Sequence, residues 1–181
     1  MPIFRRASVS LAAVTAILLG AQAAAPSPAI RLDTDPAWRQ AATVPDLTGI
    51  LNRWLDGHGP YPRRADPVTV RLIDRSATAT LKGSAARMGQ NTRGLYDPDT
   101  ATIWLVAPWS PKRAGDVAVL LHELVHHRQQ GARHWYCPGA QEPDAYGLQD
   151  AWLAERGLRA DFNRIALVLE AGCTRRDIHP D

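Results

Sequence analysis

The chain of 181 residues is 45% hydrophobic and 22% charged, and its formal net charge is +3 at pH 7. Its basic residues form no stripe of the kind that binds a phosphate backbone, which argues against a nucleic-acid partner. Two of the positive charges belong to an N-terminal segment that we expect to be removed. Without them the formal charge is +1.

Residues 1–25 are typical of a bacterial export signal. Arg5 and Arg6 precede an apolar stretch from Leu11 to Leu19, and small residues then offer a cleavage site. The apolar stretch is shorter than the roughly 20 residues that a membrane-spanning helix needs. We therefore expect cleavage and a periplasmic or secreted protein with no stable membrane anchor. An uncleaved anchor is the alternative.

The mature part of the chain, residues 26–181, suits one domain. Asp35-Pro36 can start a short helix after a loose leader. A stronger helix is predicted where apolar residues recur at helical spacing before Gly57 and Gly59. These residues are Leu47, Ile50, Leu51, Trp54 and Leu55. We assign this apolar face to the core.

Strand patterns come next along the chain. Apolar and polar residues alternate at Val68, Val70 and Leu72, which predicts a strand. Residues 82–92 are rich in glycine and polar side chains and predict a loop or partial strand near a cleft. Residues 94–96 and 102–106 flank Asp97-Pro98-Asp99-Thr100, a sequence typical of a hairpin turn.

His122 and His126 carry the clearest chemical signal in the chain. The sequence from His122 is His-Glu-Leu-Val-His, and residues four apart stand on one helix face with Cβ atoms about 6 Å apart. Two imidazoles so placed can bind one zinc ion at about 2.0–2.1 Å. Glu123 follows the first histidine and lies beside the metal, where it can take a proton from a bound water. The pattern predicts a zinc-dependent hydrolase.

The surrounding sequence favours a helix over residues 116–130. It contains no proline or glycine, Ser110-Pro111 suits an N-cap and first turn, and Gly131 suits the end. Burial of a histidine pair in so apolar a helix is costly without partners, and a bound zinc ion would remove that cost. The alternative is two core or surface histidines that happen to lie four apart. His127 points about 100° away from His126, so we expect an exposed or supporting residue rather than a ligand.

A catalytic zinc ion usually keeps a third protein ligand. The downstream candidates are Glu142, Asp144, His134 and Cys137. Residues 142–153 predict the next helix, with Pro143 in its first turn. Its apolar stripe is formed by Ala145, Leu148, Trp152 and Leu153. Glu142 heads this stripe and is the preferred ligand, although a first-turn acid can also serve only to stabilise the helix dipole.

These residues resemble the gluzincins, zinc metallopeptidases with two helix histidines and a glutamate from a following helix. The resemblance covers about residues 119–149 and is looser from 93 to 158. It implies His122, His126 and Glu142 as zinc ligands and Glu123 as the general base. Independently, strands that precede helices favour an α+β fold. The resemblance implies a compact zincin-like domain, with a small antiparallel hairpin packed on the two site helices.

The resemblance also implies how the cleft is built. The strand before the histidine helix would form the rim, a substrate peptide would pair with its edge, and residues 104–109 would form the wall. Trp104 in particular can instead be a core residue. The sequence departs from the gluzincin pattern at Arg128, where an apolar residue is usual, and at Tyr146, where an aspartate often supports a ligand histidine. The hydroxyl of Tyr146 can donate a hydrogen bond to a substrate oxyanion, or the side chain can serve only in packing.

Gln129 and Gln130 lie close enough to His126 to support it by hydrogen bonds, or they are solvated near a helix end. The two cysteines, Cys137 and Cys173, predict a disulfide in an exported protein. The bridge would stabilise the fold by about 3–4 kcal/mol and would attach the loop before Glu142 to the C-terminal segment. Cys137 as a zinc thiolate is the alternative.

We therefore expect an exported zinc metallopeptidase that binds Zn²⁺ and hydrolyses peptide bonds in a peptide or protein substrate. One alternative is a non-catalytic zinc-binding envelope protein of the same fold. Another is a disulfide-linked structural domain without metal. The substrate, the choice between endo- and exopeptidase and the oligomeric state are left open by the sequence.

Overall fold

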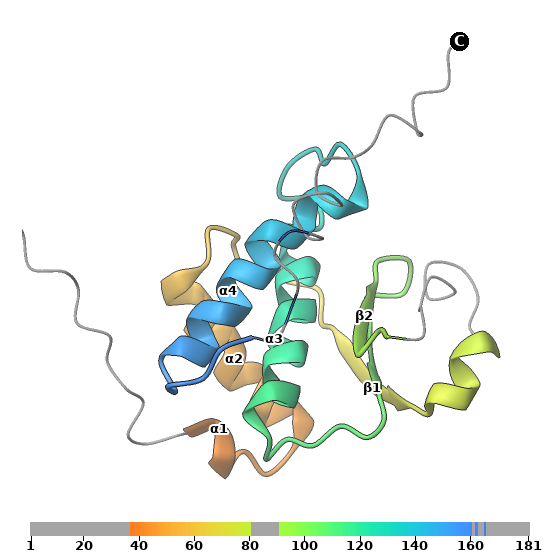
Figure 1. Cartoon of the computed structure of the whole chain (residues 1–181). Helices are drawn as coiled ribbons and strands as arrows, with labels where there is room; N and C mark the ends of the chain where they lie inside the picture. Colours follow the sequence, from red (N-terminus) through yellow and green to blue (C-terminus); the bar gives the residue numbers. More distant parts are fainter. Residues whose placement is uncertain (1–36, 81–90, 161, 163–164, 166–181) are drawn as a thin grey trace, which may run out of the picture.

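The computed structural model describes residues 37–80, 91–160, 162 and 165, and Figure 1 shows their arrangement. Within this part of the chain, four α-helices and a three-stranded sheet form a mixed α+β fold, as predicted. None of the helices described combines the length and the apolar character needed to span a bilayer.

The N-terminal helices follow the predicted pattern. Helix α1 (Ala37–Gln40) is one turn long, and α2 (Val44–His58) begins with a capping box in which Thr43 and Asp46 bond each other's backbone N–H. Leu47, Leu51 and Leu55 are fully buried, and Gly59 caps the end. Gly57 lies inside the last turn rather than after it.

The sheet has the order β1-β3-β2, with β1 (Thr69–Ile73) parallel to β3 (Thr102–Val106). Strand β2 (Gly94–Asp97) runs antiparallel to β3, which confirms the predicted hairpin. The strand predicted from the alternation at Val68, Val70 and Leu72 is confirmed as β1, although Leu72 is 59% exposed. Its neighbour Ile73 is partly buried instead.

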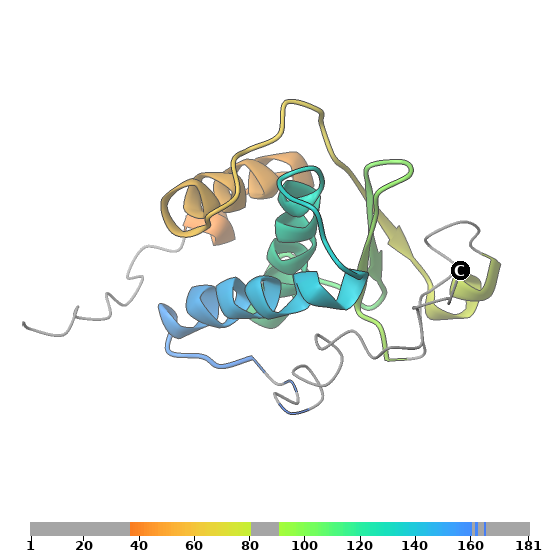
Figure 2. The same ribbon diagram turned by 90° about the horizontal axis from the view of Figure 1, so that it is seen from above.

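Helix α3 (Ala114–Gln129) lies between the sheet on one side and α2 and α4 on the other, as the two views agree (Figures 1 and 2). It is buried from Asp116 to its end, so it is the central element of the core. The predicted cap at Ser110 is wrong, because Arg113 occupies the N-cap. Asp116 instead accepts hydrogen bonds from the Ser110 backbone N–H and the Arg113 guanidinium.

Helix α4 (Glu142–Ala154) packs along α3 and starts at the predicted residue, with Pro143 in its first turn. The loop between the two helices ends in a short 3₁₀ turn over Pro138–Gln141. Ala145, Trp152 and Leu153 are its buried residues. Three of the predictions above lie outside the described residues: the export signal, most of the loop at 82–92 and the disulfide partner Cys173. The sequence also predicts a last helix that starts at Asp161 and carries Phe162, Ile165, Val168 and Leu169, and most of it lies outside the described residues too.

Candidate metal centre

His122 and His126 lie one helical turn apart on the face of α3 that meets α4. Their rings are nearly perpendicular, with centroids 4.7 Å apart, and their Nε2 atoms are separated by 3.0 Å. Both residues are buried. The structure therefore brings the two imidazoles together in the way the four-residue spacing predicts.

Glu142 completes the group from the first position of α4. Its two carboxylate oxygens face one imidazole each, at 3.2 Å from Nε2 of His122 and 3.4 Å from Nε2 of His126. Among the described residues, these three are the ones whose ligand atoms cluster closely enough to hold a metal ion. Asp144 is directed elsewhere and accepts hydrogen bonds from the Tyr61 hydroxyl and from Arg133.

Two glutamine side chains form hydrogen bonds with the Nδ1 atoms of the two imidazoles. Nδ1 of His126 lies 2.8 Å from Oε1 of Gln129, and Nδ1 of His122 lies 3.0 Å from Oε1 of Gln149. The amide nitrogen of Gln129 donates to the backbone carbonyl of Gln141 at 2.9 Å, and this bond determines which end of the amide meets the histidine. Nδ1 of His126 must therefore carry the proton and donate it to Gln129.

The sequence pointed to only part of this arrangement. Gln129 is fully buried and fills the supporting role considered for it, whereas Gln130 is exposed. Gln149 was not singled out. A signal for it exists, because it lies seven residues after Glu142 and so shares its helix face.

The donor set fits a zinc ion. The two Nε2 atoms face each other across 3.0 Å, and Glu142 directs one carboxylate oxygen at each of them, so atoms of three ligand-type side chains surround one common point. Atoms bound at about 2.0–2.1 Å to one tetrahedral ion lie about 3.3 Å apart. The three separations here, 3.0, 3.2 and 3.4 Å, bracket that value.

The electrostatics of the group also favour a cation. Burial acts to raise the pKa of Glu142, but hydrogen bonds with His122 and His126 outweigh it and hold the pKa well below its usual range. Burial acts to lower the pKa of His126, but Glu142 and Glu123 outweigh it and raise that pKa. The site therefore keeps its carboxylate ionised and attracts positive charge.

Glu123 lies beside this group, between α3 and strand β2. Burial raises the pKa of its carboxyl, while the nearby imidazoles of His122 and His126 act in the opposite direction. The backbone N–H of Tyr96 donates to the carboxylate. A Cβ atom on Gly94 would lie 2.8 Å from Oε1 of Glu123 and 2.7 Å from Val119. Glycine at 94 therefore allows β2 to approach the carboxylate closely.

An open cleft of about 1510 Å³ runs along the metal group. Its walls come from residues 91–96, the loop 130–141, residues 158–160 and Phe162. The predicted wall at residues 104–109 is wrong, because strand β3 is the centre of the sheet and has a neighbour on each side. The strand that lines the cleft is β2, whose outer edge has no strand partner in the described sheet.

Tyr146 packs in this cleft against the ring of His122, with centroids 4.4 Å apart, and against Phe162 at 4.5 Å. This contact positions the histidine ring from the α4 side. A role for the Tyr146 hydroxyl at an oxyanion stays a prediction.

The residues after the histidine pair point away from the metal group. His127 is buried, not exposed: its Nε2 faces the Asp66 backbone carbonyl and its Nδ1 the Tyr96 hydroxyl, both at 3.2 Å. Arg128 is also buried and bonds Asn52 and Asp56 of α2. The departure of Arg128 from the zinc-peptidase pattern is thus explained by an ion pair between α3 and α2.

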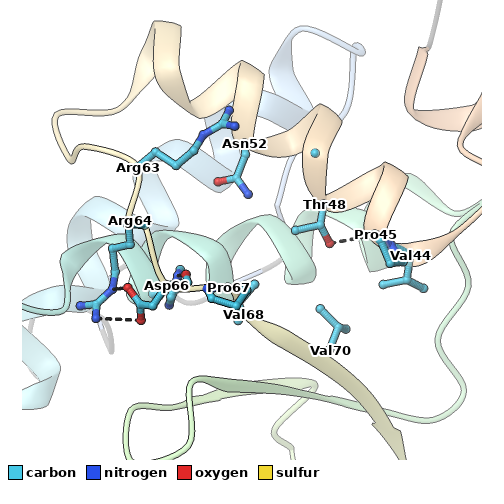
Figure 3. Close-up of a pocket in the computed structure, with 13 residues that line it drawn as sticks. Val44, Pro45, Thr48, Asn52, Arg63, Arg64, Asp66, Pro67, Val68 and Val70 are labelled. Atoms are coloured by element: carbon cyan, nitrogen blue, oxygen red, sulfur yellow. Dashed lines mark hydrogen bonds and ion pairs between the residues drawn. The ribbon is translucent and has the colours of Figure 1, made fainter.

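A second pocket of about 350 Å³ lies on this far side, between α2 and the chain that leads into β1. Figure 3 shows Arg63 and Asn52 at one end, Val68 and Val70 at the other, and Arg64 paired with Asp66. His127 lines it from α3, but none of the three metal-site residues does.

The family described as "Domain of unknown function (DUF6647)" matches residues 40–181. This range includes all residues of the metal centre and its cleft, and the chain belongs to that family. No curated protein and no solved structure matches the chain.

Proposed function

We propose that this member of the DUF6647 family is an exported zinc-dependent metallopeptidase, with His122, His126 and Glu142 as ligands and Glu123 as general base. One observation carries the proposal. Three side chains of the types that bind zinc converge within 3.0–3.4 Å, and the outer nitrogen of each imidazole already has a hydrogen-bond partner. This is how ligand histidines are commonly oriented.

Zinc bound by this group supplies a Lewis acid that activates water and polarises a carbonyl. Gln129 and Gln149 hold the two imidazoles with Nε2 directed at Glu142. Glu123 accepts the proton of the attacking water and delivers it to the leaving amine. The raised pKa of its buried carboxyl suits this exchange, since the group must hold a proton between the two transfers.

The cleft favours catalysis over a purely structural metal site. A structural zinc ion is usually enclosed by four protein ligands, whereas a catalytic one faces a space that a substrate can enter. Here the group of three faces a cleft of about 1510 Å³, bordered by the outer edge of β2. An extended peptide can add to such an edge as a further strand.

The substitution Glu123→Gln tests the assigned base. We expect the variant to bind zinc as the wild type does and to lose at least about 100-fold in hydrolysis, because a positioned base contributes on that order. Zinc is measured by elemental analysis after reconstitution, and hydrolysis by mass spectrometry of a digested peptide library with and without chelator. Glu155→Gln, the same change at the far end of α4, is the matched control and should stay active.

Two results would contradict the proposal. Retained hydrolysis in Glu123→Gln would refute the role of that carboxylate. A reconstituted wild-type chain that binds zinc but cleaves nothing in the library would favour the non-catalytic zinc-binding alternative, and a chain that binds no zinc would refute both.

A further inference from the structure

The charged side chains that line the cleft outside the metal group and Glu123 are all basic in the described part of the chain. Apart from Glu123 and the metal group, the charged residues that line it in the described part of the chain are Arg93, Arg133 and Arg159, together with the titratable His134. Arg93 precedes β2, Arg133 and His134 lie on the loop between α3 and α4, and Arg159 follows α4. The arginines therefore approach the cleft from three separate segments.

The carboxylates near these arginines do not cancel their charge. Arg93 and Arg113 share one carboxylate, that of Asp116, which is buried with 3% of its side chain exposed. Two guanidinium groups on one carboxylate leave a net positive charge, and Arg93 is itself 58% exposed. The cleft is therefore positive on the β2 side.

The other two sides carry further positive charge. Arg159 is exposed and has no ion-pair partner within the described ranges. Arg133 stacks on the ring of Trp135 at 3.9 Å and reaches Asp144 at 3.3 Å, but its side chain remains 57% exposed. Asp144 also accepts the hydrogen bond of the Tyr61 hydroxyl, so its charge is shared.

A bound divalent ion would not change this sign. Its two positive charges balance the carboxylates of Glu123 and Glu142, which are the acids that line the cleft among the described residues. The arginines then remain uncompensated. Guanidinium groups form paired hydrogen bonds with carboxylates, and a cleft lined by one sign of charge raises the local concentration of the opposite sign.

We infer that the cleft selects acidic polypeptide segments, with Asp or Glu side chains on both sides of the bond that is cleaved. The inference rests on the proposed peptidase function for the cleavage itself, but the binding preference rests on the arginines alone. Each exposed guanidinium–carboxylate contact changes the affinity by roughly 2- to 5-fold, so three together give about 10-fold or more.

The binding arm of the test uses zinc-loaded Glu123→Gln, which should not turn over. Two fluorescein-labelled decapeptide pools are titrated, one containing Asp and Glu but no basic residue, the other with Asn and Gln in their place. Fluorescence anisotropy should show about 10-fold tighter binding of the acidic pool, and most of the difference should disappear when NaCl rises from about 0.05 to 0.5 M. Equal binding of the two pools would overturn the inference.

Charge-reversal variants test whether the preference for the acidic pool arises in the cleft. Arg159→Glu should reduce the preference for the acidic pool at least about 3-fold. Arg71→Glu changes the net charge equally but lies on exposed strand β1, outside the residues that line the cleft, and should leave the preference unchanged. An equal effect of both substitutions would assign the preference to overall charge and overturn the role of the cleft.

The hydrolysis arm separates the inference from the proposed function. With wild-type enzyme, the acidic pool should be cleaved with a higher kcat/KM than the neutral pool. Cleavage of both pools at equal rates would refute the acidic preference and leave the peptidase assignment intact. Selective binding of the acidic pool without cleavage of either pool would refute the peptidase assignment and leave the binding preference for acidic peptides intact.

Discussion

The two histidines of the metal group are each held by a neutral side-chain amide. Carboxylates, backbone carbonyls and waters are the more common acceptors for the outer N–H of a ligand histidine. Gln129 is fixed in orientation by its own bond to the Gln141 carbonyl, directly before Glu142. One buried side chain thus connects His126 on α3 to the segment that presents Glu142. A neutral acceptor adds no negative charge to the site.

Removal of the amide at Gln149 should weaken zinc binding. Gln149→Leu keeps the side-chain size and deletes the acceptor for Nδ1 of His122, so we expect a loss of about 10- to 100-fold in zinc affinity. Gln149→Glu retains an acceptor and should keep most of the affinity. Competition against a chromophoric chelator measures the dissociation constant. Gln130→Leu, an exposed site on the same cleft, is the control, and an equal loss there would contradict the role of Gln149.

At the scale of elements, α3 is unusual because almost every face of it is covered. The face toward α4 carries the metal group, the face toward β2 carries Glu123, and the face toward α2 carries Arg128. A buried guanidinium is costly unless its donors are satisfied. Asn52, Asp56 and the Tyr61 carbonyl accept its hydrogen bonds, and they hold α2 against the helix that carries the metal site.

Asp56→Asn should destabilise the fold in a pH-dependent way. The hydrogen bond from Arg128 is the main cause that holds the pKa of Asp56 below its usual 3.8. A carboxyl whose pKa is lower in the folded state than in the unfolded state stabilises the fold at pH values above its unfolded-state pKa. This stabilisation is lost as the pH falls through the folded-state pKa. Because the side chain is 45% exposed, we expect a loss of only about 1 kcal/mol near pH 7.

Urea unfolding of both metal-free chains measures this difference. It should shrink as the pH falls below 3.8, where the wild-type carboxyl also becomes protonated. Arg63→Ala removes the exposed partner of the same carboxylate and should cost less. A pH-independent difference would contradict the ion pair as its source.

At the scale of the whole molecule, the metal group links α3 to α4 across the loop 130–141. A ligand that binds only the folded chain stabilises it, and zinc ligands from two helices exist as a group only after folding. The same loop supplies one wall of the cleft. Under the proposed function, we expect stability and substrate binding to be coupled through the position of α4.

Zinc should raise the melting temperature of the chain. At free zinc about 100 times the dissociation constant, the gain is about 2.7 kcal/mol, or roughly 5–10 °C for a domain of this size. Thermal unfolding is compared after chelation and after zinc is added back. His126→Ala should fold without this response. An equal shift in that variant would show that zinc acts elsewhere on the chain.

Much of the fold and the centre of the site could be read from local patterns. Apolar spacing predicted α2, the turn residues at 97–100 predicted the hairpin, and four-residue spacing predicted the meeting of His122 and His126. The start of α4 at Glu142 followed from the proline in its first turn. Each of these depends on contacts between residues close in the chain, which the sequence displays directly.

The surroundings of the site were decided by tertiary structure alone. Strand order placed β2 rather than β3 beside Glu123. Full coverage of α3 buried Arg128 and also His127, which the sequence favoured as an exposed or supporting residue. Gln149 and the three arginines reach the cleft from segments distant in sequence. Pairing between distant segments depends on how whole elements pack, and no local spacing encodes it. The sequence by itself thus determined the candidate ligands, and the packing of α4 and β2 on α3 determined the cleft they face.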